Sequence, residues 1–212
     1  MNRFLLGKLL GIFLCVLLLS ACSGKRQVVV QEKSGKLLSC IAVLPTGTLI
    51  HRQENVSYKQ AENIKKGMKQ VDNILVDKLN DKGKFRFITQ KQVDAVMTLK
   101  KDDQLDQLRM IADKSSCDGI LATSISRYRQ RVGSSVSVDS AASATVHMKL
   151  ISSSSGQVLW EDVFHETQEA LLNNLLSLKK VAKHGFRWIT VEELVDNGVE
   201  ELLAQCPYIA DN

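Results

Sequence analysis

A hairpin pattern in the second half of the chain constrains the fold most strongly. Apolar and polar residues alternate from Ala144 to Leu150, which is the period of two typical of a strand with one polar face. A serine-rich turn over residues 152–156 then reverses the chain, and Trp160 and Phe164 share one face of the returning strand. An antiparallel pair of this kind needs a sheet to join and helices to cover its apolar side.

The residues before and after this hairpin predict that sheet and those helices. Apolar runs indicate strands at Leu38–Pro45, Phe85–Ile88 and Gly119–Ser126. Helical spacing indicates helices over 56–79, after Thr89, after Asp102 or Asp103, over 171–181, and after the capping box Thr190–Glu193. The order predicts an α/β (α+β) fold with a mixed sheet. Units of β-α-β-α-α-β give parallel strands, the C-terminal hairpin adds antiparallel ones, and the helices pack on the sheet in a single domain over 38–212.

Three cysteines fall within this domain. Cys40 and Cys117 each precede an apolar strand-like run. If those strands are parallel neighbours, the two thiols lie at the same end of the sheet and can form a disulfide. Cys206, after the last helix, competes for either partner, and three buried reduced thiols remain an equal alternative. None of the three has a cysteine or histidine at metal-binding spacing, so we expect no metal site.

The first 21 residues have the three zones of a secretory signal peptide. Arg3 and Lys8 supply positive charge, and the run from Leu9 to Leu19 is almost wholly apolar but too short to span a membrane, which takes about 20 residues. The sequence Leu19-Ser20-Ala21-Cys22 then resembles the lipobox of bacterial lipoproteins. The resemblance implies cleavage before Cys22 and attachment of lipid to its thiol, which would bind the protein to a membrane by its acyl chains.

The residues after Cys22 bear on the compartment. Residues 22–37 are mostly polar and predict a flexible tether. By resemblance to enterobacterial sorting, in which Asp after the cysteine retains a lipoprotein in the inner membrane, Ser23 implies the outer membrane. We therefore expect a lipid-anchored protein on the periplasmic face of the outer membrane.

The mature domain has a resemblance of its own, which covers about residues 38–170. It is similar to the periplasmic domain shared by curli-secretion lipoproteins (CsgG-type) and lipoprotein activators of penicillin-binding proteins (LpoB-type), a domain that resembles the N-terminal domain of TolB. The stretches that carry this resemblance are Ile41–Pro45, Phe85–Thr89, Cys117–Leu121 and Val146–Trp160. The resemblance implies a non-catalytic role in an envelope complex.

Composition and motifs favour a binding protein over an enzyme. The 28 Lys and Arg residues barely exceed the 23 Asp and Glu, so the chain lacks the concentrated charge of a nucleic-acid binder. The four histidines are scattered, no serine lies in a nucleophile motif, and no glycine-rich loop could hold a phosphate, so we expect no cofactor. We expect an adaptor or assembly factor, with an envelope protein or a second copy as its partner. The alternative is a lipid-anchored hydrolase whose site is scattered in the sequence.

The partner is expected to dock between residues 127 and 149. A basic run enters the segment Gly133–Ser143, which is small, serine-rich and expected to be a mobile loop. The polar positions of the following strand, including Thr145, should face outward beside it. The residues expected to contact the partner are Arg127, Arg129, Arg131, His147 and Lys149.

Replacing the expected lipid acceptor tests the anchor. The change Cys22→Ala removes the thiol that forms the thioether, so the variant should remain an unlipidated precursor. Metabolic labelling with an alkyne fatty acid measures this, with Cys15→Ala as the matched control that keeps its label. A wild-type protein without a label that depends on Cys22 contradicts the expectation.

Overall fold

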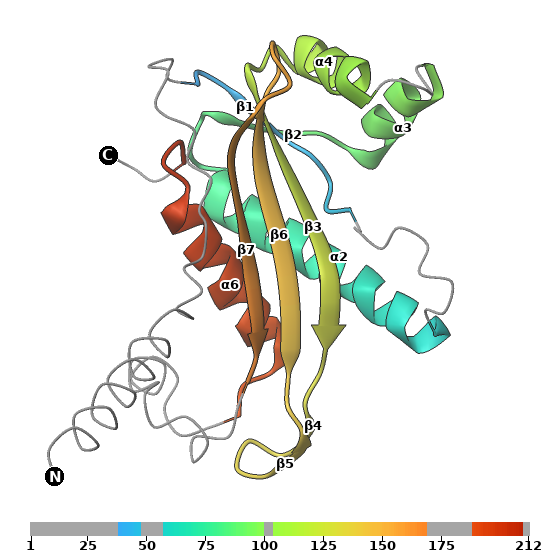
Figure 1. Cartoon of the computed structure of the whole chain (residues 1–212), viewed down its shortest axis with the longest axis vertical. Coiled ribbons are helices and arrows are strands. Elements are labelled where there is room, and N and C mark those ends of the chain that lie inside the picture. Colours follow the sequence, from blue (N-terminus) through green and yellow to red (C-terminus); the bar gives the residue numbers. More distant parts are fainter. Residues whose placement is uncertain (1–37, 48–56, 100–103, 169–187, 210–212) are drawn as a thin grey trace, which may run out of the picture.

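The computed structural model describes residues 38–47, 57–99, 104–168 and 188–209 (Figure 1). The expected signal peptide, Cys22 and tether, the caps at Asp102 or Asp103, and the leucine-rich helix over 171–181 lie outside these residues. None of the helices in the described ranges is both long and apolar enough to cross a membrane.

A mixed five-stranded sheet forms the centre of the domain, as the sequence predicts. Its strands lie in the order β2-β1-β3-β6-β7. The strand β1 pairs in parallel with β2 and β3, whereas β3, β6 and β7 pair in antiparallel fashion. The bounds are Ile41–Val43 for β1, Phe85–Phe87 for β2, Gly119–Arg129 for β3, Ser143–Ser152 for β6 and Val158–Thr167 for β7.

Three predictions were wrong in extent. The first strand was expected over Leu38–Pro45, but β1 spans only Ile41–Val43. The strand β3 continues to Arg129 and so includes two of the basic residues that were placed after it. The expected loop over 133–143 instead contains a small hairpin of β4 (Val132–Gly133) and β5 (Val138–Ser140). Gly133 makes this hairpin feasible, because its φ of 113° is unfavourable for other residues and an added Cβ would lie 2.5 Å from the Ser137 carbonyl oxygen. The segment lacks apolar alternation, so its pairing left no signal in the sequence.

The helices α2 (Tyr58–Leu79) and α6 (Val191–Gln205) cover one face of the sheet, behind it in Figure 1. Each begins with a capping box, Ser57 with Gln60 and Thr190 with Glu193, which satisfies backbone N–H groups at the helix start. Both helices approach the sheet closely at a glycine. A Cβ on Gly67 would lie 2.7 Å from Ile125 and Tyr128, and one on Gly198 would lie 2.4 Å from Phe164.

The opposite face is covered at one end only. The helices α3 (Gln90–Leu99) and α4 (Gln104–Ser115) pack there in two small apolar clusters, with Ala42 of β1 and Ile120 of β3. Arg86 of β2 fixes the end of α4, because its Nη1 donates to the Ser115 carbonyl oxygen at 2.8 Å. Figure 1 shows both helices beside the end of the sheet where β1 and β2 lie. The lengths of β3, β6 and β7 beyond that end lack a helical cover among the described residues.

A covalent and hydrogen-bonded clamp joins β1 to β3. Cys40 and Cys117 form a disulfide with Cα atoms 4.6 Å apart, and Cys206 is free and buried. The Asp118 carboxylate accepts hydrogen bonds from the backbone N–H groups of Ser39 and Cys40, at 3.1 and 3.0 Å. Burial raises the pKa of Asp118, but these hydrogen bonds outweigh burial and leave its pKa below the ordinary value. The clamp therefore fixes the start of the three-residue strand β1 beside β3.

Removing the disulfide should lower the free energy of unfolding by about 2–4 kcal/mol, because it closes a loop of 77 residues in the unfolded chain. The measurement is urea unfolding of the double variant Cys40→Ala/Cys117→Ala with and without reductant. Reductant should lower the free energy of unfolding of the wild type and of the control Cys206→Ala. It should leave that of the double variant unchanged. A non-reduced peptide map without a Cys40–Cys117 linkage contradicts the clamp.

Candidate functional site

The uncovered part of the sheet presents a surface lined by polar side chains, which we call the polar sheet face. Strand register defines it, because residues that pair across neighbouring strands point to the same side. Its opposite side carries Ile125, Val146 and Phe164 in the main core. The members of the polar sheet face are Ser124, Ser126, Arg127, Arg129, Ser143, Thr145, His147, Lys149, Glu161, His165 and Thr167. Ser143 and Thr145 are buried beneath their neighbours on this face, so the expectation that Thr145 is open to solvent was wrong.

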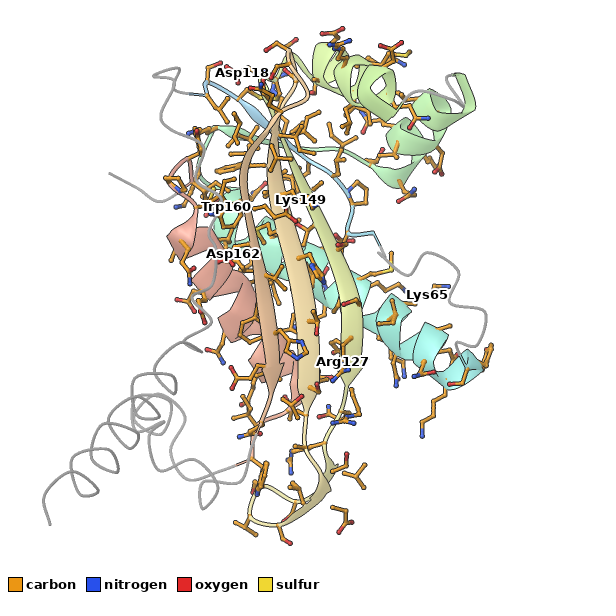
Figure 2. The ribbon with its side chains drawn as sticks, viewed as in Figure 1. Lys65, Asp118, Arg127, Lys149, Trp160 and Asp162 are labelled. Carbon is orange, nitrogen blue, oxygen red and sulfur yellow. A yellow bond between two sulfur atoms is a disulfide. The ribbon has the colours of Figure 1, made fainter. Side chains whose placement is uncertain are left out.

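Cross-strand contacts connect these side chains (Figure 2). Lys149 and Glu161 form an ion pair at 2.9 Å between β6 and β7. Two histidines contact hydroxyl groups: His147 Nε2 lies 3.3 Å from Ser126 Oγ, and His165 Nδ1 lies 2.7 Å from Thr145 Oγ1. These contacts hold polar atoms in fixed positions on a rigid sheet, which is the arrangement that recognises a partner's polar groups.

His147 occupies the most perturbed electrostatic position on this face. Burial lowers its pKa below the ordinary histidine value, and the positive charge of Lys149 lowers it further. Glu161 acts in the opposite direction and only partly compensates. His147 is therefore predominantly neutral near pH 7, so it offers one donor and one acceptor nitrogen.

The contact between Ser126 and His147 has the form of a nucleophile beside a base. A working triad also needs a group that orients the other ring nitrogen, and among the described hydrogen bonds Nδ1 of His147 has no carboxylate partner. Ser126 lies within a strand and not at a strand–turn–helix elbow. No group of three metal-ligating side chains occurs in the described ranges. The contact between Ser126 and His147 therefore lacks two features of a serine hydrolase site among the described residues.

Four of the five residues expected to contact a partner lie on the polar sheet face. Arg127 and Arg129 are exposed and pair in register with Thr145 and Ser143, while His147 and Lys149 are half-buried on β6. Figure 2 shows Arg127 near the far end of β3 and Lys149 farther up β6.

Arg131 does not lie with these four. Its Nη1 donates to the Gly133 carbonyl oxygen at 3.1 Å, and its Nε is buried without a hydrogen-bond partner among the described residues. Arg131 thus contacts the β4–β5 hairpin.

The residues between the arginines attach β3 to α6. The Tyr128 hydroxyl donates to Glu192 Oε1 at 3.1 Å, and Gln130 Nε2 donates to Glu192 Oε2 at 2.7 Å. The Gln130 amide oxygen accepts the backbone N–H of Val191, in the first turn of α6. Burial raises the pKa of Tyr128, and the neighbouring carboxylate of Glu192 raises it further, so this hydroxyl remains a donor. Arg127 and Arg129 therefore lie on the polar sheet face, and Tyr128 between them attaches β3 to α6 on the other side of the sheet.

Sequence reasoning missed several members of the site, among them Ser126 and Glu161. It also missed the contact of His165, which is exposed, with Thr145. A signal existed for Glu161, because an acidic residue on the returning strand can pair with Lys149 across a hairpin. Its position opposite Lys149 depends on a register shift between Leu150 and Ile151 that the turn sequence does not specify.

Comparison with known proteins gives similarity in outline only. No family model matches the chain, and no curated protein is similar to it. Among solved structures, the PelC dodecamer from Paraburkholderia phytofirmans is 14% identical over 85% of this chain and 96% of that chain, with a TM-score of 0.48. The LpoB C-terminal domain from Escherichia coli is 14% identical over 66% and 90%, with a TM-score of 0.39. Lipoprotein GNA1162 from Neisseria meningitidis is 14% identical over 68% and 99%, with a TM-score of 0.37. At these TM-scores the similarity supports no conclusion about the residues of the polar sheet face.

The ion pair beside His147 provides a test of this electrostatic picture. Lys149→Met should raise the pKa of His147 and Glu161→Gln should lower it, because the two charges act on the imidazolium in opposite directions. Histidine-ring NMR titration between about pH 5 and about pH 8 measures both shifts, with the resonance assigned from His147→Gln. Shifts in the same direction in the two variants contradict the assignment.

The same depressed pKa makes folding stability depend on pH. The unfolded chain binds a proton at His147 more readily than the folded one, so this contribution is complete above about pH 6.5 and is lost as the pH falls toward the folded pKa. The dependence should be weaker in His147→Gln than in the wild type, as measured by urea unfolding across the same range.

Proposed function

We propose that this chain is a non-catalytic adaptor or assembly factor of the bacterial cell envelope, anchored by lipid on Cys22 at the periplasmic face of the outer membrane. Its polar sheet face receives an envelope protein. The lipid would keep the domain at the membrane, and the tether over 22–37 would give it limited reach.

The observation that carries this proposal is the pair of exposed arginines on a sheet face that the described helices leave uncovered. Arg127 and Arg129 project from the far end of β3. Within the described residues, the only side-chain hydrogen bond of either arginine is the long contact of Arg127 with Ser143, at 3.5 Å. The acidic member of the polar sheet face, Glu161, pairs with Lys149. The face therefore has an excess of positive charge, which favours a partner with carboxylates at matching positions.

The edge of the sheet supports the same conclusion. In the described part of the chain β7 pairs only with β6, so its other edge lacks a strand partner beside the polar sheet face. An edge strand of ten residues can accept an extended segment of a partner by backbone hydrogen bonding, although the Val163 N–H donates to Asp162 Oδ1 at 2.7 Å. Backbone pairing would supply affinity there, and the arginines would supply selectivity.

Charge reversal at the arginines tests this function. The double variant Arg127→Glu/Arg129→Glu should reduce co-purification of the partner from crosslinked envelopes at least about tenfold, because attraction becomes repulsion at two positions. Its melting temperature should hardly change, since surface substitutions typically alter stability by about 0.5 kcal/mol or less.

The matched control is Lys91→Glu/Lys114→Glu, which changes the net charge equally on the exposed surfaces of α3 and α4. It should leave the partner yield unchanged. An unchanged yield in the arginine variant, with normal melting, would remove the partner from the polar sheet face.

A further inference from the structure

The outer surfaces of α2 and α6 carry opposite charges, away from the polar sheet face. Four lysines lie in the first half of α2, and all are exposed: Lys59, Lys65, Lys66 and Lys69. The one acidic residue among them, Glu62, accepts a hydrogen bond from the Tyr58 hydroxyl at 3.2 Å. We call these four residues the α2 lysine surface.

The fold does not use these lysines. The core side of α2 consists of Ile64, Gly67 and Val71, and the lysines lie around the opposite side of the helix. Within the described residues, none of the four has an ion pair or a hydrogen bond through its side chain. Lys59 lies in the first turn, where positive charge opposes the helix dipole. Their concentration in twelve residues of sequence therefore needs another explanation.

The helix α6 has the complementary composition. It contains five acidic residues and no lysine or arginine. Glu192 and Glu193 lie in its first turn and bind Gln130 and the Thr190 cap. Asp196, Glu200 and Glu201 lie along its outer side, the α6 acidic surface, where Glu201 Oε1 accepts a hydrogen bond from Gln205 at 3.1 Å. Lys78 of α2 approaches Asp196 and Glu200 only at 3.7 and 3.9 Å, and the acidic side chains are 49% and 56% exposed. One partly exposed lysine does not neutralise this surface.

We propose that the α2 lysine surface of one copy docks on the α6 acidic surface of a second copy. The two surfaces cannot meet within one molecule, because the first half of α2 extends past β3 on one side of the sheet and α6 lies behind β6 and β7 (Figure 1). Figure 2 shows Lys65 on that extending part of α2. The contact joins two different surfaces, so each copy keeps one of each free for the next, and the assembly is a closed ring or an open chain.

This inference deepens the proposed function by naming a second copy as a partner, at a surface separate from Arg127 and Arg129. Each exposed ion pair contributes little to binding, so the association is weak in dilute solution and sensitive to salt. Confinement by the lipid anchor would raise the local concentration and favour assembly at the membrane.

Two charge-reversed variants of the lipidated chain test the contact. Lys65→Glu/Lys66→Glu makes both surfaces acidic, and Glu200→Lys/Glu201→Lys makes both basic. In sedimentation velocity with a neutral detergent, the wild type should associate at about 50 mM salt and dissociate at about 0.5 M. Each variant alone should associate at least about tenfold more weakly, because identical charges face one another.

An equimolar mixture of the two variants should regain association to within about threefold of the wild type. In the mixture, the native α2 lysine surface of the basic variant meets the native α6 acidic surface of the acidic variant. The reversed α2 surface of the acidic variant meets the reversed α6 surface of the basic variant, so the charges are complementary in both contacts. The double variant Lys91→Glu/Lys114→Glu, with the same charge change elsewhere, should associate like the wild type.

Three outcomes overturn the inference. A wild type that remains monomeric at low salt is one, and a mixture that fails to associate although both variants melt normally is another. If Lys65→Glu/Lys66→Glu instead loses binding to vesicles containing phosphatidylglycerol and mixing restores nothing, the α2 lysine surface binds lipid. The proposed function then still depends on the separate arginine variant, whose partner yield is independent of these results.

Discussion

The strand β3 determines the rest of the architecture, because it is the strand that joins the parallel and antiparallel parts of the sheet. It has eleven residues, whereas its parallel neighbour β1 has three. The crossover helices α3 and α4 consequently pack only beside the short parallel part, since they connect β2 to β3 there. The antiparallel part extends beyond them. The helices α2 and α6 support it on one side, and on the other side no helix of the described ranges covers it. The mismatch in strand length thus creates the polar sheet face.

The elements with strong periodic patterns could be predicted from the sequence. The apolar spacing along α2, the capping box of α6 and the alternation in β6 each specify an element and its buried side, and the structure has all three. The parallel arrangement of β1 and β3 also followed from element order, and the structure shows the Cys40–Cys117 disulfide at their common end. In these cases local propensity and tertiary packing favour the same conformation, so neighbouring residues contain the information.

The details of the site depend on contacts between strands that local sequence does not encode. Simple alternation from Ile125 would place Arg127 on the core side of β3. The bulge around Ser126 shifts the register, so Arg127 lies on the same face as Thr145. The shift at Leu150 and Ile151 likewise decides which acidic residue faces Lys149. A shift of one residue in the pairing moves every later side chain to the other face of the sheet. A sequence can therefore predict the strands correctly and still not determine which side chains meet on the polar sheet face.

The clamp between β1 and β3 has a consequence for the order in which the chain can fold. The strand β1 is an inner strand of the sheet, but both strands that pair with it come later, β2 at residue 85 and β3 at residue 119. During synthesis from the N-terminus, the apolar residues Ile41, Ala42 and Val43 therefore remain without strand partners until those residues emerge. Cys117 precedes Cys206 in the chain, so the native partner of Cys40 is also the first to become available.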